Sequence, residues 1–219
     1  MKLIVNIQAV MGIIMFSFFM AMVPAAEAKD AVKVLAFGDS LSAGYGLPKK
    51  DAFPYQLELA LKAQDQSISV VNGGVSGDTT AGGRSRLDWL LSPDIDVVVI
   101  ELGANDGLRG LDPALTRQNL DWILTRLKEK RKTIILSGMM APPNLGADYG
   151  SKFNAIYPDL AKRHNITLDP FFLQDVAAIA ELNQKDGIHP NAKGVKIIAH
   201  RLAGVVITVL AQKNSRPRE

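Results

Sequence analysis

The chain has 219 residues, of which 47% are hydrophobic and 21% are charged, with no cysteine and a net charge of +3. These proportions are ordinary for a globular domain, so disordered, collagen-like and low-complexity architectures are excluded. The absence of cysteine excludes disulfides, thiolate nucleophiles and cysteine-bound metals, and the small net charge does not indicate a nucleic-acid partner.

Residues 1–28 have the features of a cleaved secretory signal peptide. Lys2 supplies a positive start, residues 9–23 are uncharged and almost wholly apolar, and Ala26-Glu27-Ala28 matches an A-x-A cleavage site. A membrane-spanning helix usually needs about 20 apolar residues; this core is shorter, and an uncleaved anchor is the alternative. We therefore expect a periplasmic or secreted protein with no stable membrane anchor after cleavage, in which residues 29–219 form one domain.

Beyond the signal, segments with strand-like and helix-like patterns alternate along the chain. In chain order we expect a strand at 32–37, a helix at 53–64 capped by Asp51, a strand at 69–71 ended by Asn72-Gly73-Gly74, a helix at 80–91 and a strand at 96–101. A helix starting at Asp112-Pro113, a strand at 133–136, a loop at 141–150, a helix ending near His164, a strand at 166–168 and a helix at 192–212 follow. This alternation predicts an α/β fold, a three-layer α/β/α sandwich with a five-stranded parallel sheet.

Ligands bind at the carboxyl ends of the strands in such sheets, and three strands are followed there by loops with candidate catalytic residues. In Gly38-Asp39-Ser40 the serine lies on a sharp strand-to-helix turn, where its hydroxyl and N–H can both face the sheet edge; a helix cap is the alternative. In Ser76-Gly77-Asp78-Thr79 the glycine N–H can point at developing negative charge, unless the segment is only a flexible turn. In Gly103-Ala104-Asn105-Asp106 the amide of Asn105 can donate to an oxyanion, or it only stabilises the turn.

A fourth loop, Asp186-Gly187-Ile188-His189-Pro190, precedes the last helix. An aspartate three residues before a histidine can place its carboxylate against the ring N–H, which fixes the tautomer and supports the imidazolium. The chain has three histidines, and none is clustered with carboxylates at the spacing of metal ligands. We therefore expect neither a metal nor a cofactor.

Serine, glycine, asparagine and histidine occur in this order on the four loops, and from Val34 to the last helix the chain resembles the SGNH (GDSL) hydrolases. The similarity is greatest to a periplasmic branch of multifunctional thioesterases, lysophospholipases and arylesterases. The segment Asn105-Asp106-Gly107-Leu108-Arg109-Gly110 resembles the pattern of that branch. Ala104 stands where many members carry a second glycine. The resemblance implies the flavodoxin-like SGNH hydrolase fold. It also implies small-molecule acyl substrates, namely aryl esters, acyl thioesters and lysophospholipids.

The expected mechanism is hydrolysis through an acyl-enzyme on Ser40. His189 is expected to be the general base, oriented by Asp186. The N–H groups of Ser40 and Gly77 and the side-chain amide of Asn105 are expected to form the oxyanion hole.

Two loops, residues 106–111 and 139–149, are expected to flank the substrate groove, and their apolar side chains suit an acyl chain. The candidate wall residues are Leu108, Leu111, Met139, Met140, Pro142, Pro143 and Leu145. Met139 and Met140 can equally belong to the core. Asp39 is expected to brace the nucleophile turn rather than to act as a catalytic acid.

Three other functions are weighed against this hypothesis. A carbohydrate O-acetylesterase would share the whole mechanism and differ only in the groove. A non-catalytic periplasmic protein could bind an anion with Ser40 and the glycine loops, but this gives no reason for Asp186 and His189 at their spacing. A metallophosphoesterase needs several metal-binding histidines, which the chain lacks.

Overall fold

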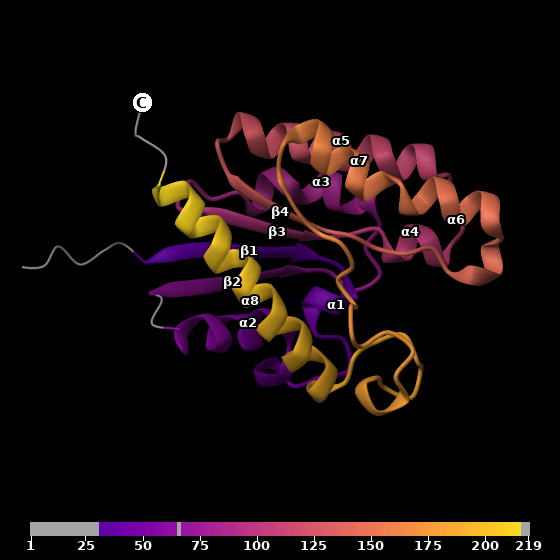
Figure 1. Ribbon diagram of the computed structural model, residues 1–219, viewed down its shortest axis with the longest axis horizontal. Coiled ribbons are helices and arrows are strands. Elements are labelled where there is room, and N and C mark those ends of the chain that lie inside the picture. Colours follow the sequence, from indigo (N-terminus) through magenta and orange to yellow (C-terminus); the bar gives the residue numbers. More distant parts are fainter. Residues whose placement is uncertain (1–30, 65–66, 216–219) are drawn as a thin grey trace, which may run out of the picture.

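The computed structural model describes residues 31–64 and 67–215, and the predicted signal peptide lies outside these residues. Five parallel strands lie between two layers of helices in the order β2-β1-β3-β4-β5 (Figure 1). This is the flavodoxin-like order of doubly wound sheets, and it confirms the predicted three-layer fold. The strands are β1 (Val32–Gly38), β2 (Ile68–Gly74), β3 (Val97–Glu101), β4 (Thr133–Ser137) and β5 (Thr167–Asp169).

The long helices cover the two faces of the sheet. One layer consists of α2 (Phe53–Lys62) and α8 (Ala192–Asn214), and the other of α3 (Thr80–Leu90), α5 (Pro113–Glu129) and α7 (Ile156–His164) (Figure 1). The remaining helical segments are short: α1 (Ser40–Ala43), η1 (Lys49–Asp51), α4 (Ala104–Leu108), η2 (Pro143–Leu145), α6 (Ala147–Asn154) and η3 (Ala180–Leu182).

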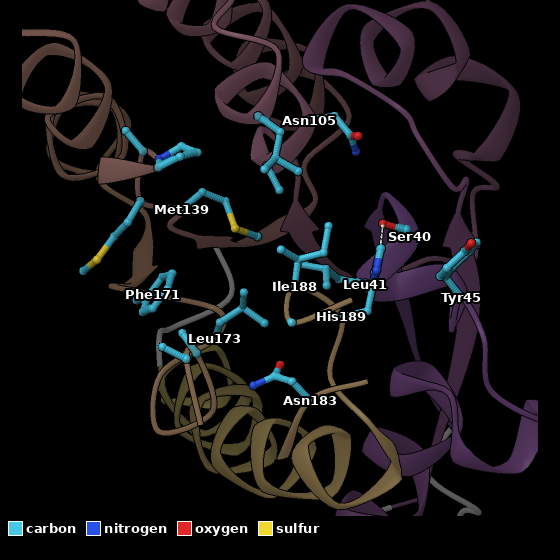
Figure 2. Close-up of a pocket in the computed structure, with 18 of the residues that line it drawn as sticks. Ser40, Leu41, Tyr45, Asn105, Met139, Phe171, Leu173, Asn183, Ile188 and His189 are labelled. Atoms are coloured by element: carbon cyan, nitrogen blue, oxygen red, sulfur yellow. Dashed lines mark hydrogen bonds between the residues drawn. The ribbon is translucent and has the colours of Figure 1, made fainter. Parts of the chain in front are cut away.

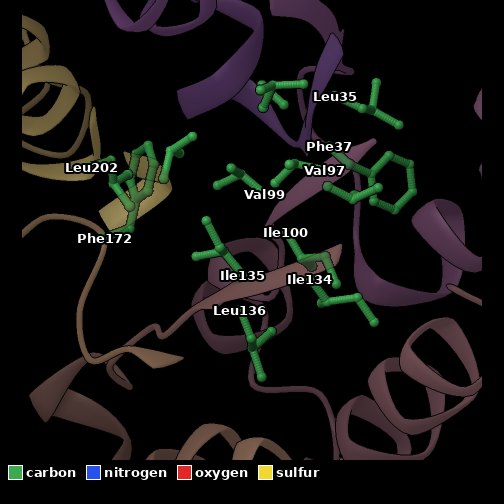
Figure 3. Close-up of a cluster of buried hydrophobic side chains, with 14 of the residues drawn as sticks. Leu35, Phe37, Val97, Val99, Ile100, Ile134, Ile135, Leu136, Phe172 and Leu202 are labelled. Atoms are coloured by element: carbon green, nitrogen blue, oxygen red, sulfur yellow. The ribbon is translucent and has the colours of Figure 1, made fainter. Parts of the chain in front are cut away.

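The core lies along the central strands, which are apolar and β-branched because both faces of the sheet are covered. Every residue of β3 is buried. Figure 3 shows side chains of β1, β3 and β4 on the sheet, with Phe172 and Leu202 packed beside them. By length and composition α8 could span a membrane. In the described chain, however, its stripe of Val195, Ile198 and Leu202 is buried in the core.

The last residues of the five strands stand opposite one another in a single row. Pairing joins Gly74 to Gly38, Gly38 to Glu101, Glu101 to Ser137, and Ser137 to Asp169. The last three are buried and polar, and the Ser137 hydroxyl donates to Asp169 Oδ2 at 2.9 Å. We call these five residues the end row. The loops that follow the strands all start from this level.

Two expected boundaries in the first part of the fold are wrong. Asn72-Gly73-Gly74 continues β2 instead of ending it, because the glycines let neighbouring segments approach; a Cβ on Gly74 would lie 2.2 Å from Ala43 N. Asp51 does not cap α2 but belongs to η1, and the N-cap residue, Ala52, makes no side-chain cap hydrogen bond. A proline in the first turn of α2 favours its start instead.

The segment predicted as a loop at 141–150 is partly helical. It contains η2 and the first half of α6, which ends at Asn154 just before α7 begins. Sequence reasoning also missed α1 and α4. Both are single turns next to the site, too short to show a periodic apolar pattern.

Candidate active site

Ser40 begins α1, two residues beyond the end of β1. The turn is tight, because a Cβ on Gly38 would lie 2.6 Å from the backbone oxygen of Glu101, so only glycine fits. Asp39 is the N-cap of α1, and its Oδ1 accepts a hydrogen bond from Leu41 N at 3.0 Å. The turn thus carries the Ser40 hydroxyl to the carboxyl edge of the sheet, as the sequence predicts.

His189 reaches Ser40 from the loop between η3 and α8. Its Nε2 lies 2.9 Å from Ser40 Oγ (Figure 2), and its Nδ1 lies 2.7 Å from Asp186 Oδ2. Asp186 Oδ1 also accepts the N–H groups of Ile188 and His189, each at 3.1 Å. Burial alone would raise the pKa of Asp186, but these hydrogen bonds outweigh it and lower the pKa. An ionised Asp186 can therefore hold the imidazole with Nε2 toward the serine.

The loop that carries His189, residues 183–191, is called the histidine loop, and hydrogen bonds connect it to the chain segment that follows α1. Gln184 Nε2 donates to Tyr45 O at 2.8 Å and to Pro190 O at 3.0 Å, while Gln184 N donates to His189 O at 2.7 Å. The Tyr45 ring is tilted over the imidazole, with ring centroids 4.7 Å apart. Sequence reasoning missed Gln184 and Tyr45, because bonds to backbone carbonyls leave no motif.

Gly77 and Asn105 lie near Ser40 on two further loops. Gly77 adopts φ +82°, which favours glycine, and the Arg109 guanidinium donates to its carbonyl at 2.8 Å. Asn105 is the second residue of α4, and its Nδ2 donates to Asp39 Oδ2 at 2.9 Å. Within the described chain, the N–H groups of Ser40 and Gly77 have no acceptor. Three donors are thus available beside the serine hydroxyl.

Two carboxyl groups are buried beneath the nucleophile. Glu101 Oε2 accepts hydrogen bonds from Asp39 N at 3.2 Å and from the N–H and hydroxyl of Ser42 at 3.1 and 2.8 Å. Burial, followed by the nearby charge of Asp39, raises the pKa of Glu101 well above its usual range. Burial also raises the pKa of Asp39 to about 6, although hydrogen bonds from Leu41 and Asn105 act against it. Asp39 is therefore ionised at neutral pH.

Ser40 opens into a groove of about 450 Å³ with mainly apolar walls (Figure 2). Five of the predicted wall residues line it: Leu108, Met139, Met140, Pro142 and Pro143. Met139 is almost fully buried, whereas Met140 is 57% exposed. The first therefore belongs to both core and wall, and the second is free to contact a ligand.

Leu111 and Leu145 were also predicted to line the groove, and the structure places them outside it. The Tyr149 hydroxyl donates to the carbonyl of Leu111 at 2.8 Å, which holds this residue against α6. Leu145, in η2, lies beside Gly110. Neither residue lines the groove: Leu111 is 38% exposed, and Leu145 lies in the segment that precedes α6.

The rest of the groove lining was not predicted. It comes from the segment after β5 and from the histidine loop, and it includes Phe171, Leu173, Ala177, Ala178 and Ile188. Figure 2 shows Phe171 and Leu173 beside Met139, on the side of the groove away from Ser40. The position of Phe171 and Leu173 directly after a strand could have indicated them, because every loop at this edge of the sheet can contribute to the site.

No group of three His, Asp or Glu side chains in residues 31–64 and 67–215 is arranged to hold a metal ion. The chemistry available is that of a hydroxyl nucleophile, an imidazole base with an orienting carboxylate, and three N–H donors beside an apolar groove. This combination suits attack on a carbonyl carbon and stabilisation of the resulting oxyanion.

Known proteins share both sequence and structure with this chain. Residues 36–197 match the model of the GDSL-like Lipase/Acylhydrolase family. The arylesterase of Vibrio mimicus is 40% identical over 179 residues, which are 81% of this chain and 90% of that protein. The thioesterase 1/protease 1/lysophospholipase L1 of Escherichia coli K12 is 40% identical over 189 residues, 86% of this chain and 88% of that protein. The crystal structure of AlinE4, an SGNH-hydrolase family esterase, matches with a TM-score of 0.70 and 46% identity, covering 83% of this chain and 98% of that one.

Proposed function

Because this chain belongs to the GDSL-like lipase/acylhydrolase family and is a carboxylic ester hydrolase, we propose that Ser40 is its nucleophile and the groove beside Ser40 its acyl site. The observation that carries the proposal is the pair of contacts made by His189, at 2.9 Å to Ser40 Oγ and 2.7 Å to Asp186 Oδ2. Both distances are those of well-formed hydrogen bonds.

In the first half-reaction, Ser40 Oγ attacks the carbonyl carbon and its proton moves to His189 Nε2. The tetrahedral intermediate then collapses, the bond to the leaving oxygen or sulfur breaks, and the leaving group takes the proton from His189. In the second half-reaction, water attacks the acyl-enzyme and gives a proton to the same nitrogen. Collapse releases the carboxylic acid and returns the proton to Ser40.

The negative charge of both intermediates is stabilised by the N–H groups of Ser40 and Gly77 and by the side-chain amide of Asn105. Support comes from their shared position on the groove and from the two backbone N–H groups that have no acceptor in the described part of the chain. Loss of one such donor typically slows catalysis by about 10²–10³-fold. Three donors therefore supply a large part of the rate acceleration.

The substrates are acyl esters and thioesters with short to medium chains, including aryl esters, and lysophospholipids are a further class. Apolar side chains on both walls, such as Met140 and Leu173, favour a hydrocarbon chain over an acetylated sugar. The names of the two relatives support the same range: one is an arylesterase and the other a thioesterase and lysophospholipase. Nucleic acid is not among the expected partners.

The proposed location is the periplasm or the exterior of the cell. Lys2, the apolar segment 9–23 and Ala26-Glu27-Ala28 support a signal peptide cleaved near residue 28. The mature chain would be the single domain 29–219, with no stable membrane anchor.

The test is a panel of p-nitrophenyl esters of increasing chain length, assayed beside an acetylated sugar and a lysophospholipid. We expect activity on the aryl esters and covalent labelling of Ser40 by a fluorophosphonate. The Ser40→Ala and His189→Ala variants should fold normally and lose both the esterase activity and the labelling. Labelling of another residue, or full activity of Ser40→Ala, would disprove the assignment of the nucleophile. A preference for the acetylated sugar would disprove the acyl groove.

A further inference from the structure

The side-chain amide of Asn105 has two ends of similar size, and only the nitrogen can stabilise an oxyanion. If the amide were reversed, its oxygen would face the developing negative charge and oppose the reaction. A neighbouring group must therefore fix which end faces Ser40. In Figure 2 the nitrogen of Asn105 lies on the Ser40 side, and this nitrogen donates to Asp39 Oδ2 at 2.9 Å.

An ionised carboxylate fixes an amide in this orientation, because it accepts hydrogen bonds and cannot donate them. Asp39 is fully buried, so water does not compete for its oxygens. Its Oδ1 accepts from Leu41 N at 3.0 Å, and its own N–H donates to Glu101 Oε2 at 3.2 Å. The carboxylate is thus held by a backbone N–H of the helix that carries Ser40, and the backbone of Asp39 is held by Glu101 in the end row of the sheet.

We propose that Asp39 is a positioning residue for the oxyanion hole, which holds the Asn105 amide with its nitrogen toward the reacting carbonyl. One hydrogen of Nδ2 goes to Asp39, and the other remains for the substrate. The role rests on the proposed function, in which Asn105 stabilises the oxyanion. The Asp39 carboxylate also links α1 to α4, since it accepts hydrogen bonds from a residue of each helix.

The ionisation of Asp39 supports a role in catalysis rather than in stability. Burial raises its pKa to about 6, and hydrogen bonds from Leu41, Asn105 and Ser40 only partly offset this. The titratable groups that face it are Glu101 from β3, the imidazole of His189 and the Tyr157 hydroxyl from α7. A carboxyl whose pKa is higher in the folded than in the unfolded chain lowers the stability of the fold as the pH rises above the unfolded pKa, and the loss is complete above the folded pKa. A neutral side chain would therefore serve a purely structural role better.

The substitution Asp39→Asn tests the proposal, because it leaves one side-chain oxygen for three donors: Leu41 N, the Asn105 amide and the more distant Ser40 hydroxyl at 3.4 Å. When the oxygen caps α1, the new amide nitrogen faces Asn105 and favours the reversed amide. We expect kcat for p-nitrophenyl butyrate to fall by about 10²-fold, as for the loss of one oxyanion donor, with KM within about threefold of wild type. The Tm near pH 8 should equal or exceed that of wild type, because the buried charge is gone.

The matched control is Asp112→Asn. Asp112 is also an N-cap, accepting from Ala114 N at 2.9 Å at the start of α5, so the substitution changes the same chemical group away from the groove. It should leave kcat and KM unchanged. A loss of activity in this variant as large as in Asp39→Asn would overturn the proposal.

The double variant Asp39→Asn/Asn105→Ala separates the proposal from the function it rests on. If Asp39 acts through Asn105, the double variant should be no slower than Asn105→Ala alone. Multiplicative losses, a normal kcat in Asp39→Asn beside a slow Asn105→Ala, or a lowered Tm near pH 8 would each overturn the positioning role and leave the proposed function intact. A normal kcat in Asn105→Ala would instead remove Asn105 from the oxyanion hole.

Discussion

Replacing Asp186 with asparagine tests the orienting role of this carboxylate with little change in shape. Asp186 Oδ1 accepts two backbone N–H groups at 3.1 Å and Oδ2 accepts the ring N–H of His189 at 2.7 Å. The single amide oxygen of the variant can accept hydrogen bonds either from the two backbone N–H groups or from the ring N–H of His189. Two neutral hydrogen bonds are worth about 1 kcal/mol each, so the oxygen should stay with the backbone and the NH₂ group should face the ring.

In that arrangement the imidazole must present a lone pair to the amide and carry its proton on Nε2. A protonated Nε2 cannot take the proton of Ser40, so the variant is in the wrong tautomer. In a serine-protease triad this change lowers kcat by about 10⁴-fold. Four factors of ten at about 1.36 kcal/mol each correspond to about 5.4 kcal/mol of lost transition-state stabilisation. We expect a similar loss for Asp186→Asn.

The assay is kcat/KM for p-nitrophenyl butyrate near pH 8, together with the Tm. The Tm of Asp186→Asn should stay near that of wild type, whereas Asp186→Ala should also lower it because all three hydrogen bonds are lost. Asp175→Asn is the matched control, since Asp175 is exposed on the same long loop and has φ +64°, a conformation that asparagine also tolerates. If Asp186→Asn kept more than about a tenth of wild-type activity, the tautomer reasoning would be refuted.

Three further predictions follow from packing, groove and charge. Gly74→Ala would place a Cβ 2.2 Å from a backbone nitrogen of α1, so urea unfolding should show a loss of about 1–3 kcal/mol and kcat should fall; an unchanged unfolding midpoint would contradict this. Met140→Ser should raise KM for octanoyl but not acetyl esters, because Met140 is 57% exposed on the wall; equal effects on both esters would argue against an acyl contact. The pKa of Asp39 is raised to about 6, so kcat should fall as the pH falls through about 6, because a protonated Asp39 can donate to the Asn105 oxygen. If the pH profile of Asp39→Asn kept the same inflection, the ionisation would belong to another group.

The sequence predicts the strands and long helices of this fold well, because β3 is apolar throughout and α5 and α8 carry apolar stripes of helical period. It predicts the short segments poorly. One-turn helices such as α1 depend on a single cap from Asp39 and on contacts with β2. Such contacts join residues far apart in the chain and leave no local pattern.

The site divides in the same way. The sequence predicts Ser40, Gly77 and Asn105 from short motifs after strands. It predicts Asp186 and His189 from a motif before the last helix, and the structure brings all five to one edge of the sheet. The walls were half predicted, because apolar residues after a strand look the same whether they face a groove or a neighbouring helix.

The end row forms a rigid base for the active site, and the loops that follow the strands form groove walls that can vary without changing this base. Its polar members, such as Glu101 and Ser137, are buried and hydrogen-bonded at one level of the sheet, so changes in loop length above them need not disturb the base. The segments 139–146 and 171–179 follow β4 and β5, which β3 separates from β1, the strand that precedes Ser40. Lengthening or exchanging them is therefore the natural route to a different acyl preference within one unchanged reaction centre.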